Sequence, residues 1–91
     1  MAVTNTKISV GSSTTVILGN RESRKCAIIV NDSDEAVYLS LSDTAVMNEG
    51  IRLNANGGSL EINAGNMYKG VIAGICTSGS KNVTVSEIYE N

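Results

Sequence analysis

The sequence has no histidine, no proline, no phenylalanine and no tryptophan, and its 91 residues include only three tyrosines. Without histidine, the Ser-His and Cys-His systems that activate a nucleophile are excluded, and so are histidine metal sites. We therefore expect a protein that is not an enzyme. Without proline, glycine and Asn, Asp or Ser must make the turns. With so few aromatic rings, aliphatic side chains must build a modest core, and we expect it to gain burial from partner subunits.

Charge is low and scattered, with seven Lys and Arg against nine Asp and Glu and a net charge of −2. Binding to nucleic acid or to a membrane surface needs a basic patch or stripe, so we expect neither partner. No apolar run approaches the roughly 20 residues of a membrane helix. Residues 1–6 lack the basic start and apolar stretch of a secretion signal, which predicts synthesis in a cytoplasm. Cys26 and Cys76 are then expected to be reduced core thiols.

The fold class follows from short runs rich in Val, Ile and Thr, whose stiff side chains suit a pleated strand. The runs predicted as strands are residues 4–10, 14–18, 25–30, 37–41, 51–53, 59–62, 68–77 and 82–89. Residues 43–50 are the one segment that could hold a helical turn. Seven or eight short strands with turns every 8–12 residues predict an all-β protein, a single antiparallel β-sandwich of which the jelly roll is one form. We expect the sandwich in residues 19–91, preceded by a strand or arm in residues 1–18 that contacts a neighbouring subunit.

Alternation along each strand assigns the faces, because successive side chains point to opposite sides. The residues that it groups as apolar faces are Ile8 and Val10; Val16 and Leu18; Cys26, Ile28 and Val30; Val37, Leu39 and Leu41; Val83 and Val85. The pattern breaks at Glu87 and Ile88, which predicts a bulge or a change of neighbouring strand there. Residues 68–77 are apolar or small on both faces, which predicts a central strand or one face covered by another subunit.

Two groups of charged residues are candidate sites. Asp32, Asp34 and Glu35 resemble the start of a calcium loop, but Ala36 and Val37 stand where a further ligand and a glycine are needed. We therefore predict a solvated turn and no metal or cofactor, and leave open a single ion bound between subunits. The local basic group Arg21, Arg24 and Lys25, with Lys7 near the N-terminus, is either a solvated surface or a docking contact for an acidic partner.

Residues 24–41 resemble the small structural proteins of tailed bacteriophages. The resemblance lies in a basic residue, the run Ala27 to Ser33 and the run Val37 to Leu41, and it continues to cover about residues 20–90. It implies a β-sandwich virion protein without catalytic activity, made in the host cytoplasm. Residues 1–18 match this pattern least.

Within that resemblance, the favoured function is a capsid decoration (cement) protein that binds and stabilises the assembled shell. Its partners would be the major capsid protein, or another virion protein, and further copies of itself in a homo-oligomer, with a trimer favoured. The alternative is a tail, neck or head-fibre component. A second alternative, from another class, is a carbohydrate-binding module that uses Tyr38, Tyr68 or Tyr89 as a sugar platform.

Overall fold

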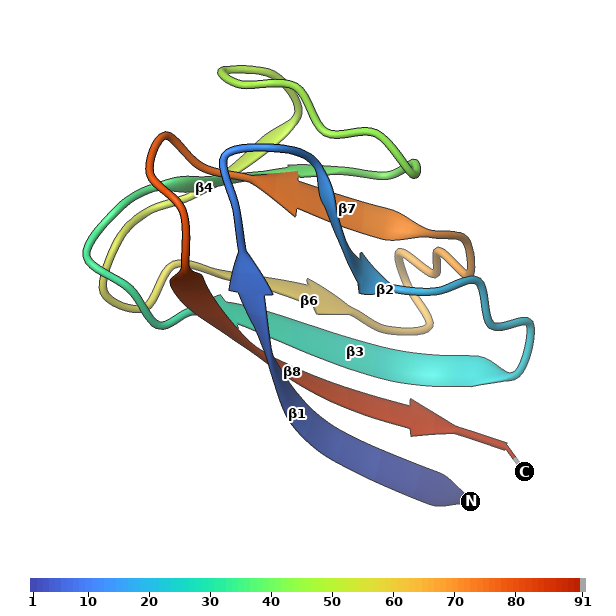
Figure 1. Cartoon of the computed structure of the whole chain (residues 1–91). Helices are drawn as coiled ribbons and strands as arrows, with labels where there is room; N and C mark the ends of the chain where they lie inside the picture. Colours follow the sequence, from blue (N-terminus) through green and yellow to red (C-terminus); the bar gives the residue numbers. More distant parts are fainter. Residues whose placement is uncertain (91) are drawn as a thin grey trace.

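The computed structural model describes residues 1–90 and consists of two antiparallel four-stranded sheets packed face to face (Figure 1). The prediction of an all-β sandwich is confirmed. The strands are β1 (Ala2–Val10), β2 (Thr15–Leu18), β3 (Arg24–Asn31), β4 (Val37–Ser40), β5 (Ile51–Leu53), β6 (Ser59–Ile62), β7 (Ile72–Ile75) and β8 (Lys81–Tyr89). The first sheet has the order β1-β8-β3-β6, and the second sheet has the order β2-β7-β4-β5.

The strand pairing is nested. β4 pairs with β5, β3 with β6, β2 with β7 and β1 with β8, all antiparallel. The chain is therefore one long hairpin, with β1 to β4 as one arm and β5 to β8 as the other. This hairpin is rolled up so that β3 also meets β8 and β4 also meets β7. A rolled hairpin of eight strands in two sheets is a jelly roll.

The core lies between the two sheets and is aliphatic. Its buried members are Val10, Ile17, Leu18, Ala27, Ile29, Val37, Leu39, Leu53, Ile62, Ile72, Cys76, Val83 and Val85. Gly74 of β7 also faces this layer, and a Cβ atom there would lie 2.6 Å from Cδ1 of Ile17. The glycine therefore makes room for an isoleucine from the neighbouring strand.

The face of β3 is opposite to the one predicted. Ala27, Ile29 and Asn31 are fully buried, whereas Ile28 is exposed and Cys26 and Val30 are half-buried on the outer side. Both alternating sets of β3 contain apolar residues, so hydropathy alone did not separate them. The structure buries the set that contains Asn31 because its amide donates to the carbonyl oxygens of Glu35, Leu53 and Asn54 at 2.8–3.2 Å and so holds two turns.

Three further assignments differ from the prediction. Leu41 lies past the end of β4 and is 48% exposed instead of sharing the buried face of Val37 and Leu39. In β2, Val16 is half-exposed and Ile17 and Leu18 are buried, because the register with β7 shifts between Val16 and Leu18. In β8, the alternation does not break: Glu87 is buried in line with Val83 and Val85. The irregularity lies in β3, between Arg24 and Cys26, where the extra residue Lys25 forms a bulge.

Residues 1–18 are paired within the sandwich instead of forming an arm beside it. β1 pairs with β8 from Ala2–Tyr89 to Val10–Lys81, and β2 pairs with β7. Ile8 packs against the core and Val10 is buried, as the alternation predicted. β1 is an edge strand of the first sheet, so its other side is unpaired by this chain.

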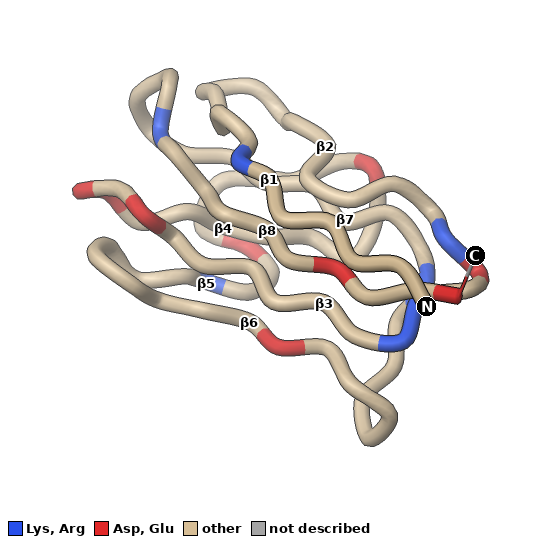
Figure 2. Tube along the Cα trace, turned by 90° about the horizontal axis from the view of Figure 1, so that it is seen from below, with Lys and Arg blue, Asp and Glu red and all other residues tan. Residues whose placement is uncertain are grey.

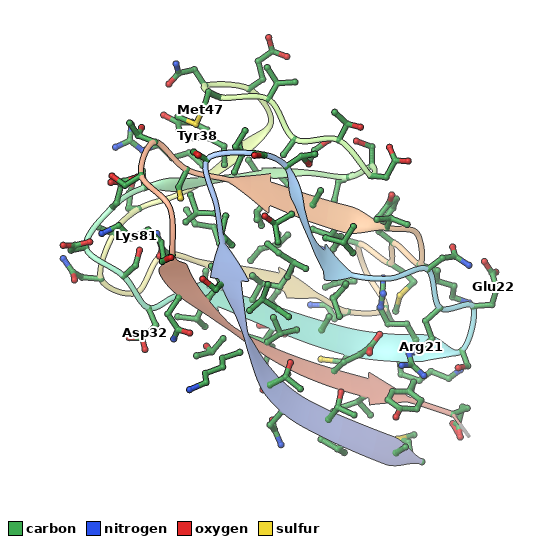
Figure 3. The ribbon with its side chains drawn as sticks, viewed as in Figure 1. Arg21, Glu22, Asp32, Tyr38, Met47 and Lys81 are labelled. Carbon is green, nitrogen blue, oxygen red and sulfur yellow. The ribbon has the colours of Figure 1, made fainter. Side chains whose placement is uncertain are left out.

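The outer face of the second sheet is covered at its centre by the chain itself. Ala73 and Ile75 of β7 point outward, and Ala45, Met47 and Tyr38 pack on them. Residues 41–50, here called the cover loop, run across this face, and Figure 3 shows Met47 above Tyr38 there. The loop contains a turn in which the Glu49 N–H donates to the Val46 oxygen, and no helix. β7 is thus central in its sheet, and the outer cover predicted for this strand comes from its own chain.

Candidate binding surfaces

Arg24 was predicted to lie on a docking surface, but the structure buries it completely at one end of the sandwich. Its Nε donates to Glu87 Oε2 at 2.8 Å. The remaining guanidinium nitrogens donate to the carbonyl oxygens of Tyr68, Gly70 and Gly19 at 2.9, 3.2 and 2.7 Å. Arg24 therefore ties two loops to β8 from inside. The bulge at Lys25 is what turns Arg24 inward, and that is why the prediction of an exposed side chain was wrong.

Arg21 lies beside this buried pair, at the surface. Its guanidinium sits 3.6 Å from the centroid of the Tyr89 ring, its Nε is 3.2 Å from Glu87 Oε1, and its side chain is 39% exposed. The Arg21 N–H donates to the Lys69 oxygen at 2.8 Å. We call the charged surface residues here the anchored end; they are Arg21, Glu22, Lys25, Lys69 and Glu90. Arg21, Glu22 and Lys69 stand on the loops that Arg24 fixes, and Lys25 and Glu90 stand at the adjoining ends of β3 and β8.

The outer side of the first sheet is open to solvent, and Figure 2 looks onto it with β1, β8, β3 and β6 crossing the view in that order. Its outward residues form rows across the strands. The rows are Val3, Ile88, Cys26; then Asn5, Ser86, Ile28, Glu61; then Lys7, Thr84, Val30, Ser59; then Ser9, Asn82. We call these residues the bare face. Val3 is 59% exposed and Ile28 is 39% exposed.

The charges of the bare face lie at its margins. Lys7, a predicted partner-binding residue, is on the edge strand β1, and Glu61 is on the opposite edge strand β6. Within residues 1–90 neither side chain takes part in an ion pair. Lys25 stands just past the first row, beside the end of β8. The face is therefore a mixture of apolar and small polar residues with opposite charges on opposite edges.

The acidic turn does not gather its carboxylates around one point. Asp34 pairs with Lys81 at 2.7 Å, Glu35 accepts from the N–H and hydroxyl of Ser78 at 2.7 and 2.8 Å, and Asp32 meets Asn82 at 3.3 Å. The Lys81 hydrogen bond lowers the pKa of Asp34, and the Ser78 N–H lowers the pKa of Glu35. In the described part of the chain no three acidic or thiol groups come close enough to hold a metal. The turn instead fastens the loop that leads from β7 in the second sheet to β8 in the first sheet.

The three tyrosine rings are half-buried and engaged by other groups. Tyr89 lies under Arg21, and Tyr38 packs against the residues below the cover loop. The Tyr68 hydroxyl donates to the Val71 oxygen at 2.8 Å. A pocket of ≈ 140 Å³ beside the cover loop is smaller than ordinary ligand pockets. These observations do not favour a sugar platform.

Both cysteines are free, as predicted. Cys76 is buried in the core, where burial raises the pKa of its thiol. Cys26, expected in the core, instead faces outward on the bare face and is half-exposed.

Sequence reasoning did not single out Glu61, interpreted Glu87 as a break in the strand, and considered Tyr89 only as part of a sugar platform. The burial of Glu87 could have been predicted from the sequence, because Glu87 continues the alternation of the buried residues Val83 and Val85. The place of Glu61 on the bare face could not have been predicted, because it depends on the pairing of β6 with β3.

Comparison of the chain with known protein families, with curated proteins and with solved structures gives no match. Residues 1–90 contain no long apolar helix of the kind that crosses a bilayer.

Proposed function

We propose that this chain is a non-enzymatic bacteriophage virion protein that decorates the assembled capsid and stabilises it. The resemblance of residues 20–90 to small structural proteins of tailed bacteriophages supports this function. The fold is compatible with it, because viral capsid domains use jelly rolls, but lectin domains use them too. The fold alone therefore does not distinguish these functions, and the proposal rests on a binding surface, the anchored end.

The anchored end presents Arg21, Lys25 and Lys69 in positions that are set before any partner arrives. Arg24 donates to carbonyls on both sides of this end, and the Lys69 carbonyl accepts the Arg21 N–H. A preorganised surface loses less conformational freedom when it binds, so more of its contact energy appears as affinity. The partner chemistry that fits is an acidic protein surface. Glu22 and Glu90 at the same end would set the orientation of docking.

Stabilisation of a shell then follows from mass action. A docking site that spans neighbouring shell subunits exists only when those subunits are assembled. Ligand that binds the assembled state and not the free subunits shifts the equilibrium by RT ln(1 + [L]/Kd). At a hundredfold excess over Kd this amounts to about 2.7 kcal/mol per site. The mechanism needs no covalent chemistry.

The test compares two charge reversals of equal size on exposed cations. Lys69→Glu alters the anchored end, and Arg52→Glu alters the outer side of β5, on the second sheet. We expect Lys69→Glu to weaken binding to shells assembled without this chain about tenfold at low salt, and less at high salt because surface charges are screened. Arg52→Glu should bind as wild type does. Equal binding by both variants at all salt concentrations would contradict docking through the anchored end.

A tail, neck or head-fibre position is the alternative within the same class of proteins. The anchored end would serve equally well there. A low-resolution map of purified virions that carry this chain with a label separates the positions: label distributed over the shell supports decoration, and label confined to the neck, tail or fibres contradicts it.

A further inference from the structure

We propose that the bare face pairs with the bare face of a second copy of this chain around a two-fold axis. The inference goes beyond the proposed function because it concerns a different surface and stands whether or not the chain binds a shell. It rests on three observations: the face is open, its outward residues include five that are apolar, and its charges have a pattern that complements itself. The apolar members are Val3, Cys26, Ile28, Val30 and Ile88.

The strand order defines the geometry. The axis runs parallel to the strands, in the plane between the two copies, midway between β8 and β3. Rotation about it lays β1 over β6 of the second copy and β8 over β3, because the sheet order is β1-β8-β3-β6. Each row then lies over the same row of the partner. The result is a pair of sheets about 10 Å apart, as in a sandwich.

In this arrangement the marginal charges meet with opposite sign. Lys7 lies in the row of Ser59, so it falls over β6 one row away from Glu61 of the second copy. One row is two residues, or about 7 Å along a strand, and a flexible lysine side chain of about 6 Å covers that offset. The symmetry makes the contact twice. The same rotation places Lys25 against the end of β8 of the second copy, where Glu90 follows.

The centre of the face supplies apolar contact. Ile88 lies opposite Cys26 of the second copy, Ile28 opposite Ser86, and Val30 opposite Thr84. These pairs combine aliphatic groups with small side chains, which lets the two sheets approach. Isolated charges of one sign would favour a partner of the opposite sign. A cation on one margin and an anion on the other favour a surface with the same pattern reversed, which is the face itself.

The size of the face predicts a weak pair. Four strands about 4.8 Å apart are about 19 Å wide, and the seven residues from Val3 to Ser9 span about 20 Å. Each copy therefore offers about 400 Å², or about 800 Å² in total, which is below the size of stable interfaces. We expect a Kd on the order of 100 μM. Copies held side by side on a larger assembly would pair at much lower bulk concentration, because their local concentration is high.

The experiment measures self-association of the full chain by analytical ultracentrifugation up to about 1 mM, with Lys7→Glu, Glu61→Lys and their equimolar mixture. Each single variant puts two like-charge contacts into its own pair and should dimerise at least tenfold more weakly than wild type. In the mixture, the introduced glutamate of one variant meets the introduced lysine of the other, and the native Lys7 and Glu61 meet at the second contact. Hetero-pairing should therefore return to wild-type strength. The matched control is Arg52→Glu with Asp43→Lys, exposed residues away from this sheet, which should leave association unchanged.

A wild-type chain that stays monomeric at about 1 mM overturns the proposal, as does a trimer, because a two-fold face cannot build one. A mixture no stronger than the single variants also overturns it. Amide shifts on dilution should centre on Ile28 and Ser86 and spare Ala45 under the cover loop. Shell binding is read separately: a monomer that binds shells keeps the proposed function and removes this inference, and a dimer that ignores shells does the reverse.

Discussion

The cover loop covers the centre of the second sheet's outer face, whereas the first sheet leaves its outer face to solvent. Ala73 and Ile75 under the loop are 0% and 9% exposed, while Val3 and Ile28 on the bare face are 59% and 39% exposed. A single short loop is enough to turn an outer face into a second small core. Without such a loop, the first sheet interleaves its apolar residues with Asn5, Thr84 and Ser86. The same chain thus has one outer face covered by a loop and one outer face in which polar residues alternate with apolar ones.

The largest effect is expected when the same substitution is made on both faces. Ile75→Asp places a charge beneath the cover loop without a partner, which should lower the free energy of unfolding by about 3 kcal/mol or more. Ile28→Asp places it in solvent, where a change of about 0.5 kcal/mol is expected. Urea denaturation at low protein concentration measures both. Similar midpoints for the two variants would contradict the contrast between the faces.

A smaller effect should follow from opening the cover itself. Gly50 has φ +86°, and a Cβ atom there would clash with the Leu39 carbonyl oxygen. Gly50→Ala should therefore cost about 2 kcal/mol and expose the amides of the cover loop to hydrogen exchange. Gly19→Ala is the control, because nothing lies within 4 Å of its added Cβ and its φ is not positive. Unchanged protection at Ala45 and Met47 in the Gly50 variant would show that the loop is not held in this way.

Acid should loosen the connection between the two sheets before it affects either face. Asp34 and Glu35, whose pKa values are lowered in the folded state, fasten the loop that leads from β7 to β8. Their contribution is present above the ordinary values of 3.8 and 4.5 and is lost as pH falls through the lower folded values. Glu35→Gln should flatten the decline of stability between about pH 5 and 3. Thermal melts across that range measure it, and parallel curves for wild type and variant would contradict it.

The smallest effect on stability is expected from alkylation of Cys26. Its thiol lies on the bare face, so a maleimide should modify it in the folded protein on the order of 100-fold faster than Cys76, which reacts only when the core opens. The free energy of unfolding should hardly change. In denaturant without reductant, both thiols should react. Equal rates for the two cysteines in native buffer would mean that the first sheet is not bare on this side.

The sequence predicted the class of fold and most strand positions, because β-branched runs and turn clusters are local signals. The sequence did not predict which face of a strand is buried where strand pairing decides it. The residues Cys26, Ile28 and Val30 alternate as convincingly as Ala27, Ile29 and Asn31. The choice between these sets is made by Asn31, whose amide is used inside the molecule.

The candidate surfaces were predictable only in part. Lys7 and Lys25 are exposed and the Arg21 side chain is 39% exposed, but Arg24 is buried because of a bulge that no local pattern marks. The bare face could not be predicted at all. Its rows come from the register of four strands that are distant in the sequence.

The nested pairing of the jelly roll also sets the order of events when the chain is made. β4 and β5 are near neighbours, but Ala2 must wait for Tyr89 before β1 has its partner. At roughly 5–20 residues per second of synthesis, that wait lasts about 4–17 s. During this interval β1 has no partner strand, and β3 has not yet paired with β8. Distant pairing of this kind folds slowly, so the first sheet of the nascent chain stays incomplete for several seconds. Lys7 is the one charged residue of β1, and lysine is a residue type that hinders an unpaired strand from pairing with the wrong partner.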